Sequence, residues 1–142
     1  MPQQQKSNVN EKYLELQILN QQIRQLQQHI ANLENQVMEL EVLEDNLEEI
    51  KKVKEGGEIL VSLGAGIFAK ANLKDNKKVI MNVGANTMVK KEIDEAKKIV
   101  KDQIDQVKDL IEDITLELEK AAVRVQSTQR EIQSMIENTK KQ

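Results

Sequence analysis

Apolar residues recur every seven residues over the first third of the chain. One series holds Leu16, Ile23, Ile30 and Val37, and the other holds Leu19, Leu26, Leu33 and Leu40. Alternating steps of three and four residues are typical of a coiled-coil seam. Leu43, Leu47 and Ile50 continue the stripe, which predicts a stammer after Leu40. We therefore expect a helix over residues 9–55, after a disordered tail at residues 1–8.

The last third of the chain repeats this spacing more regularly. Its two series are Val100, Val107, Ile114, Ala121, Thr128 and Met135, and Ile104, Ile111, Leu118, Val125 and Ile132. They predict a second coiled-coil helix over residues 92–142. Each helix would be on the order of 70 Å long, so the two suit rods that fold back on each other.

The pairing of these helices has two solutions. β-branched residues in one series and Leu in the other, as in the first helix, also favour parallel dimers of two chains. The segment between the helices favours an antiparallel hairpin within one chain, because its turns reverse the chain and keep the partner helix at high effective concentration.

The middle segment, residues 56–91, reads as short strands separated by turn residues. The expected strands cover residues 59–63, 67–73, 79–83 and 87–91, and the separators are Gly64-Ala65-Gly66, residues 74–78 and Gly84-Ala85-Asn86. The first and third separators are short and rich in residues that tolerate positive φ. They predict two β-hairpins.

An internal repeat supports this division. The segment LVSLGAGIFAK at residues 60–70 aligns with IMNVGANTMVK at residues 80–90, an offset of 20 residues. Two equivalent hairpins are therefore expected.

Neither hairpin can bury its own apolar side chains. Ile59, Val61 and Leu63 alternate with Leu60, so apolar groups occupy both faces. Isolated hairpins are marginal in water, and exposed sheet edges pair with other chains. The sequence thus predicts an α+β, mainly α, fold that oligomerises through residues 56–91.

Composition agrees with an extended shape. Only 1% of the residues are aromatic and 32% are charged, which is typical of long amphipathic helices. The net charge is −3, yet residues 56–91 carry six Lys against Glu58 and Asp75. We interpret these lysines as solubilising the strands, and expect neither nucleic acid nor a membrane as a partner.

No residue set suggests an enzyme, a cofactor or a metal site. His29 lies off the seam, the Gly64-Ala65-Gly66 segment lacks a phosphate-loop pattern, and the acidic run from Glu39 to Glu49 reads as a solvated helix face. The absence of Cys, of a signal peptide and of a spanning segment predicts a cytoplasmic protein.

Some apolar residues near the chain ends lie outside the seam. Tyr13, Leu14 and Ile18 do so in the first helix, and Ile136 does so beside Met135 in the second. An antiparallel hairpin would gather them into a flexible contact surface, although scattered surface hydrophobes are ordinary.

The order helix, two β-hairpins with GAG and GAN turns, helix resembles α-class subunits of the prefoldin chaperone. LVSLGAGIFAK and VIMNVGANTMVKK carry most of the similarity. The resemblance implies a hexamer of two α-type and four β-type subunits, with the hairpins completing an intersubunit β-barrel. It also implies that the coiled-coil tips hold unfolded proteins without ATP and deliver them to a group II chaperonin.

Two sets of site residues follow from this resemblance. The expected client contacts at the tips are Tyr13, Leu14, Ile18, Ile132, Met135 and Ile136. The expected subunit-assembly residues are Ile59, Val61, Leu63, Ile67, Phe68, Val79, Ile80, Met81, Val83, Met88 and Val89. The alternative is a structural protein that uses the same hairpins to form filaments or scaffolds.

Overall fold

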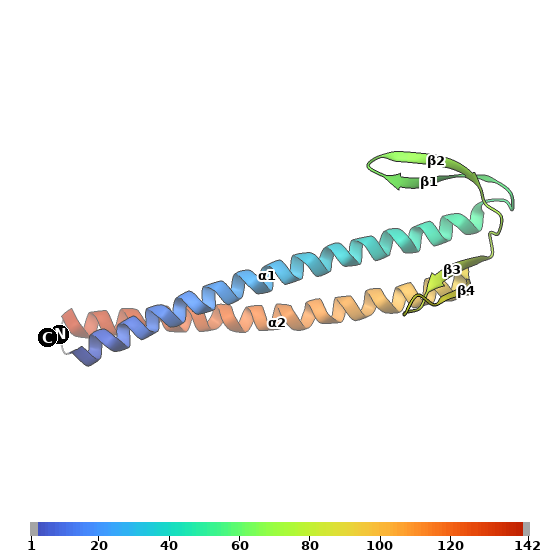
Figure 1. Cartoon of the computed structure of the whole chain (residues 1–142). Coiled ribbons are helices and arrows are strands. Elements are labelled where there is room, and N and C mark those ends of the chain that lie inside the picture. The colour runs from blue at the N-terminus through green and yellow to red at the C-terminus, as the bar shows by residue number, and fades with distance from the viewer. Residues whose placement is uncertain (1–2, 141–142) are drawn as a thin grey trace. The chain divides into compact units, whose positions relative to one another are not determined.

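The computed structural model describes residues 3–140 and contains two long helices with four strands between them (Figure 1). Helix α1 spans Gln3–Lys52 and helix α2 spans Ile93–Lys140. Strands β1 (Glu58–Gly64) and β2 (Ile67–Asn72) form hairpin 1, and strands β3 (Lys78–Asn82) and β4 (Met88–Glu92) form hairpin 2. This order confirms the predicted fold class.

The chain divides into two compact units. Of the described residues, unit 1 combines residues 3–35 with residues 108–140, and unit 2 comprises residues 36–107. In unit 1, Lys12 contacts Glu131 and Glu15 contacts Arg124, so α1 and α2 run antiparallel there. In unit 2, Glu48 contacts Lys97 and Lys51 contacts Asp94, which again requires an antiparallel pair.

The core of each unit is the helix seam, which in α2 begins at Ile93 and Ala96, before the first predicted position, Val100. Buried residues of unit 1 are Leu19, Leu33, Ile114, Ala121, Thr128 and Ile132. Buried residues of unit 2 are Val37, Leu47, Ile93, Ala96, Val100 and Ile104. The other predicted seam positions from Leu16 to Leu40 and from Val100 to Met135 are half-buried, so the heptad assignment is confirmed.

The predicted stammer after Leu40 is wrong. Leu43 is 43% exposed, whereas Glu44 is half-buried and Leu47 is buried. The seven-residue register therefore continues from Val37 through Glu44, matching the unbroken heptads of α2. A Glu at such a position keeps its aliphatic stem against the seam while its carboxylate reaches water, so the local cost is small.

The predicted disordered tail at residues 1–8 is also wrong where the structure describes it. Helix α1 begins at Gln3, and residues 1–2 lie outside the described residues. Residues 3–8 contain no Gly or Pro, and Gln and Lys are good helix formers. Helix α2 extends to Lys140 and places Asn138 and Thr139 beside Gln5 and Asn8, so the first turns of α1 have a partner.

Strand boundaries differ from the predicted ones by at most one residue, and one feature of hairpin 1 was not predicted. Its register shifts between Ser62 and Gly64, which leaves Leu63 without a position in the ladder. Leu63 is 67% exposed. Because a bulge interrupts the alternation of side chains, the expectation that Leu63 continues the face of Ile59 and Val61 is wrong.

The connection from α1 to hairpin 1 depends on close backbone approach. The Gly57 N–H donates to the Lys54 carbonyl at 2.7 Å, and the Gly56 N–H donates to the Leu73 carbonyl at 2.6 Å. A Cβ atom on Gly57 would lie 2.8 Å from the Lys54 oxygen and 2.9 Å from Val53 Cγ1. Only glycine fits there, so the sequence Gly56-Gly57 fixes where the chain leaves the helix.

Candidate functional site

The two hairpins repeat the same turn. Gly64, Ala65 and Gly66 all have positive φ, and so do the equivalent residues Gly84, Ala85 and Asn86. Positive φ at the two central residues is what the tight type I′ turn requires, and its twist matches that of the strands. The 20-residue repeat in the sequence is thus a repeat of backbone conformation.

One face of hairpin 1 carries large exposed apolar side chains. In the antiparallel register Leu60 pairs with Lys70 and Ser62 pairs with Phe68, so these four residues share a face. Leu60 is 64% exposed and Phe68 is 58% exposed. The opposite face, with Val61 paired to Ala69 and Ile59 to Ala71, is largely half-buried.

Hairpin 2 reproduces this arrangement residue for residue. Ile80 pairs with Lys90 and Asn82 pairs with Met88, positions that correspond to Leu60, Lys70, Ser62 and Phe68. Ile80 is 66% exposed and Met88 is 64% exposed. Each hairpin therefore presents one branched aliphatic residue beside a lysine and a second apolar residue beside a small polar one.

The predicted assembly residues divide into two groups by burial. Val61, Leu63, Ile67, Phe68, Ile80, Val83 and Met88 are exposed. Ile59, Val79, Met81 and Val89 are half-buried. An apolar set of this size on two-stranded sheets exceeds the singly scattered hydrophobes of an ordinary surface, so it marks a candidate interface.

Unit 1 holds a second candidate surface, an open groove of about 340 Å³. We call it the unit 1 groove; its lining residues are Glu11, Leu14, Glu15, Ile18, Leu19, Gln22 and Arg124. Leu14 and Ile18 are both 57% exposed and stand four residues apart on one side of α1. Tyr13 is 47% exposed but does not line this groove.

The structure does not gather all six predicted contact residues. Ile132 is 6% exposed and belongs to the helix seam, so it cannot contribute to a surface in this conformation. Met135 lines a different depression with Val9, and Ile136 is half-buried. Sequence reasoning did not assign Val9, Leu19 or Arg124 to these surfaces; Leu19 and Arg124 were hidden because one is a seam residue and the other is charged.

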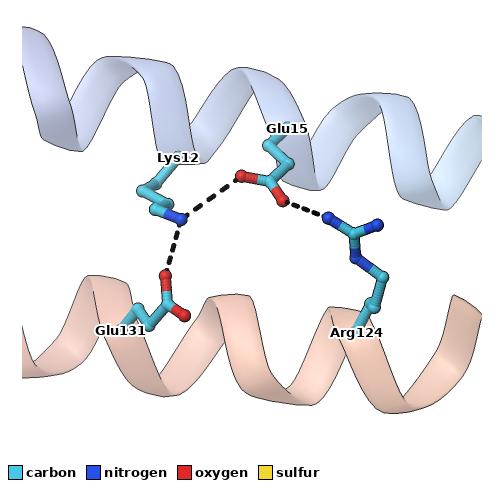
Figure 2. Close-up of polar contacts among 4 residues, drawn as sticks. All are labelled: Lys12, Glu15, Arg124 and Glu131. Carbon is cyan, nitrogen blue, oxygen red and sulfur yellow. Dashed lines mark hydrogen bonds and ion pairs between the residues drawn. The ribbon is translucent and has the colours of Figure 1, made fainter.

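Four charged residues form ion pairs that join α1 and α2 beside the unit 1 groove (Figure 2). Lys12 Nζ lies 2.7 Å from Glu131 Oε2 and 3.4 Å from Glu15 Oε2, and Arg124 Nη2 donates to Glu15 Oε1 at 3.2 Å. The hydrogen bond to Glu131 raises the pKa of Lys12, with the nearby charges of Glu131 and Glu15 acting in the same direction. Each exposed pair contributes little, but the network links α1 to α2 at this level.

A second pair of ionic contacts joins the helices where α2 begins. Lys97 donates to Glu48, and Lys51 Nζ lies 2.7 Å from Asp94 Oδ1. The hydrogen bond and charge of Lys97 lower the pKa of Glu48, and those of Lys51 lower the pKa of Asp94. Asp94 also lies in the first turn of α2, where a negative charge interacts favourably with the helix dipole.

Within residues 3–140, no three His, Asp or Glu side chains are grouped so that they could hold a metal ion. None of the described helices is long and apolar enough to span a membrane. The candidate functional surfaces are the exposed apolar faces of the two hairpins and the unit 1 groove.

Comparison with known proteins agrees with this arrangement. The prefoldin subunit family matches residues 19–138, most of the chain. The chain belongs to the prefoldin family. It is 30% identical over 130 residues to prefoldin subunit alpha of Methanococcus vannielii, covering 92% of this chain and 87% of the relative. Prefoldin subunit alpha of Archaeoglobus fulgidus is 31% identical over 124 residues, covering 87% and 90%.

A solved prefoldin shares the fold. A chain in the cryo-EM structure of filamentous PFD from Methanocaldococcus jannaschii superimposes with a TM-score of 0.71 and 21% sequence identity, covering 79% of this chain and 93% of that chain. The resemblance to α-class prefoldin subunits noted from the GAG and GAN turns is therefore confirmed at the level of both sequence and fold.

Proposed function

We propose that this chain is an α-class subunit of a prefoldin chaperone that assembles through its two hairpins with β-class subunits and holds non-native proteins. The observation that carries the proposal is the exposed apolar face repeated on hairpin 1 and hairpin 2 in a chain of the prefoldin family. Such faces need partner chains to cover them. Two equivalent hairpins provide one α-class chain with two docking positions.

The unit 1 groove is the proposed client-contact surface. Leu14 and Ile18 offer apolar area, and the flanking Glu11, Glu15 and Arg124 keep the groove hydrated. Weak contacts of this kind become effective when several subunits act on one client, because linked contacts bind by avidity. Shallow individual contacts also allow release without ATP, for example to a group II chaperonin.

Suppression of aggregation tests the holding function. A chemically denatured protein is diluted into buffer with the assembled complex, and light scattering is followed. We expect replacement of Leu14, Ile18 and Ile136 by Ser to weaken the suppression while the mass of the complex stays unchanged. Full suppression by an intact complex that carries all three changes would remove both the groove and Ile136 from the proposal.

A filament or scaffold is the second candidate function. A solved structure that shares this fold is of filamentous PFD, and at 21% identity it supports the fold alone. Sedimentation of the purified chain separates the two candidates. A closed complex of defined mass with a β-class subunit supports the chaperone, whereas concentration-dependent open growth of the chain by itself supports the filament.

A further inference from the structure

The two hairpins share a repeat but differ in charge. Hairpin 1, residues 58–72, carries Glu58 and Lys70 and is neutral. Residues 74–92, which lead into and form hairpin 2, carry five Lys against Asp75 and Glu92, a net charge of +3. The lysines are Lys74, Lys77, Lys78, Lys90 and Lys91. The excess of lysines in the middle of the chain therefore belongs to one hairpin, which general solubilisation of the strands does not explain.

Three of these lysines gather around one depression. It has a volume of about 400 Å³ and is lined by Glu55, Lys74, Asp75, Lys78, Val79, Ile80 and Lys90. Ile80, 66% exposed, pairs with Lys90 across the hairpin, and Lys78 stands two residues before Ile80 on the same face. The lining thus combines an exposed aliphatic side chain with three lysines and two carboxylates, a net charge of +1.

The carboxylate of Asp75 is held by the backbone. Asp75 Oδ1 accepts hydrogen bonds from the Lys77 N–H at 2.8 Å and from the Lys78 N–H at 3.2 Å. These bonds, with the charges of Lys90 and Lys78, lower the pKa of Asp75. In hairpin 1, by contrast, Lys70 Nζ lies 3.9 Å from Glu58 Oε1. Backbone N–H groups therefore hold the Asp75 carboxylate, and the three lysines of the lining outnumber its two carboxylates.

We propose that hairpin 2 docks on an acidic strand surface of a partner subunit, with carboxylates of the partner among Lys74, Lys78 and Lys90 and an aliphatic side chain on Ile80. Hairpin 1 docks on a surface that is close to neutral. The inference rests on the proposed function, because it names the chemistry of the partner at one of the two assembly surfaces. Contact between two copies of hairpin 2 is opposed, since it would bring the positively charged residues 74–92 of two chains together.

Binding measurements with charge-neutral variants test this assignment. The probe is the β-class prefoldin subunit from the same organism, titrated by calorimetry against the full-length chain. The variant Lys74→Gln, Lys78→Gln, Lys90→Gln is compared with Lys98→Gln, Lys101→Gln, Lys120→Gln, which removes the same charge from exposed helix positions. We expect the hairpin variant to bind about tenfold or more weakly and the helix variant to stay within about twofold of the wild type.

Salt dependence provides the second readout. Raising NaCl from about 0.05 M to about 0.5 M shortens the screening length severalfold, so binding by the wild-type chain should weaken about tenfold while binding by the hairpin variant stays nearly constant. Equal affinity and equal salt dependence of wild type and hairpin variant would overturn the assignment. Two other results would also overturn it. One is that the hairpin variant loses affinity for a single-stranded oligonucleotide but not for the β-class subunit. The other is that the wild-type chain self-associates through hairpin 2.

The outcome is separable from failure of the proposed function. If the chain binds the β-class subunit and suppresses aggregation but the lysines have no effect, the acidic-partner inference alone is wrong. If neither the wild-type chain nor any variant binds that subunit, and aggregation is not suppressed, the proposed function is wrong as well.

Discussion

The helix seams and the hairpins use the same aliphatic residues in opposite ways. In the seam Ile93 is 2% exposed and Val100 is 1% exposed, whereas in the hairpins Leu60 is 64% exposed and Ile80 is 66% exposed. A long helix satisfies its own backbone hydrogen bonds and needs only one partner stripe, which the same chain supplies. A two-stranded hairpin leaves both edges and at least one face open. The seams therefore stabilise the folded chain, whereas the hairpins leave apolar surface that a partner chain can cover.

Removing apolar side chains from both hairpins should have the largest effect on assembly and almost none on folding. We expect Phe68→Ser with Met88→Ser to weaken binding of a β-class subunit about 1,000-fold, at about 2 kcal/mol for each buried anchor residue. Helix unfolding by far-UV circular dichroism should not change. The control, Leu116→Ser with Val123→Ser, removes similarly exposed side chains from α2. An equally large loss of binding in this control would show that assembly does not depend on the hairpins more than on the helix surface.

The same residue type should respond differently in the seam and on the helix surface. Leu33 is 8% exposed and Leu116 is 51% exposed. We expect Leu33→Ala to lower the free energy of unfolding by about 2–3 kcal/mol because it leaves a cavity. Leu116→Ala should change it by less than about 0.5 kcal/mol. Urea titration of the two variants measures both values, and equal losses would contradict the assigned seam.

The junction between seam and hairpin should depend on one glycine more than on its neighbour. A Cβ on Gly57 meets the Lys54 carbonyl oxygen at 2.8 Å, while a Cβ on Gly56 meets nothing within 4 Å. Gly57→Ala should cost about 2 kcal/mol of unfolding free energy through forced backbone shifts. Gly56→Ala, which keeps a positive φ, should cost about 1 kcal/mol. A lower melting temperature for Gly56→Ala than for Gly57→Ala would contradict the close backbone approach at Gly57.

Acid should weaken the helix pair of unit 2 slightly. Lys97 and Lys51 lower the pKa values of Glu48 and Asp94 in the folded chain. Their stabilisation is therefore present above the ordinary carboxyl pKa of about 4 and is lost as the pH falls through the lower folded values. The melting temperature should decline less steeply below about pH 4 in Glu48→Gln with Asp94→Asn. An unchanged pH profile in this variant would show that the two pairs do not stabilise the helices.

The helices and their seam were predictable because heptads encode them directly. The series from Leu16 to Leu40 and from Val100 to Met135 were assigned correctly, and so were both hairpins and their turns. The error after Leu40 arose because Leu43 is apolar and Glu44 is charged, so Leu43 was assigned to the seam. In the structure the seven-residue register places Glu44 at the seam and leaves Leu43 exposed. The apolar pattern of one helix does not show which of its residues the facing helix will cover.

The candidate surfaces were only partly predictable. The exposed positions of Leu14 and Ile18 followed from their lying outside the seam, but Ile132 occupies a seam position and is buried. The bulge at Leu63 leaves no mark in the alternation of residues. The charge difference between the hairpins was present in the sequence, yet its meaning required the register that places Lys78 and Lys90 beside Ile80.

Hydrogen–deuterium exchange of the full chain, alone in dilute solution and bound to a β-class subunit, tests the account most directly. The account predicts slow exchange in the buried seams of α1 and α2 in both states, and fast exchange in β1–β4 that becomes slow on binding. Strands β1–β4 that are already protected in a chain of monomeric mass would contradict it, because the hairpins would then need no partner.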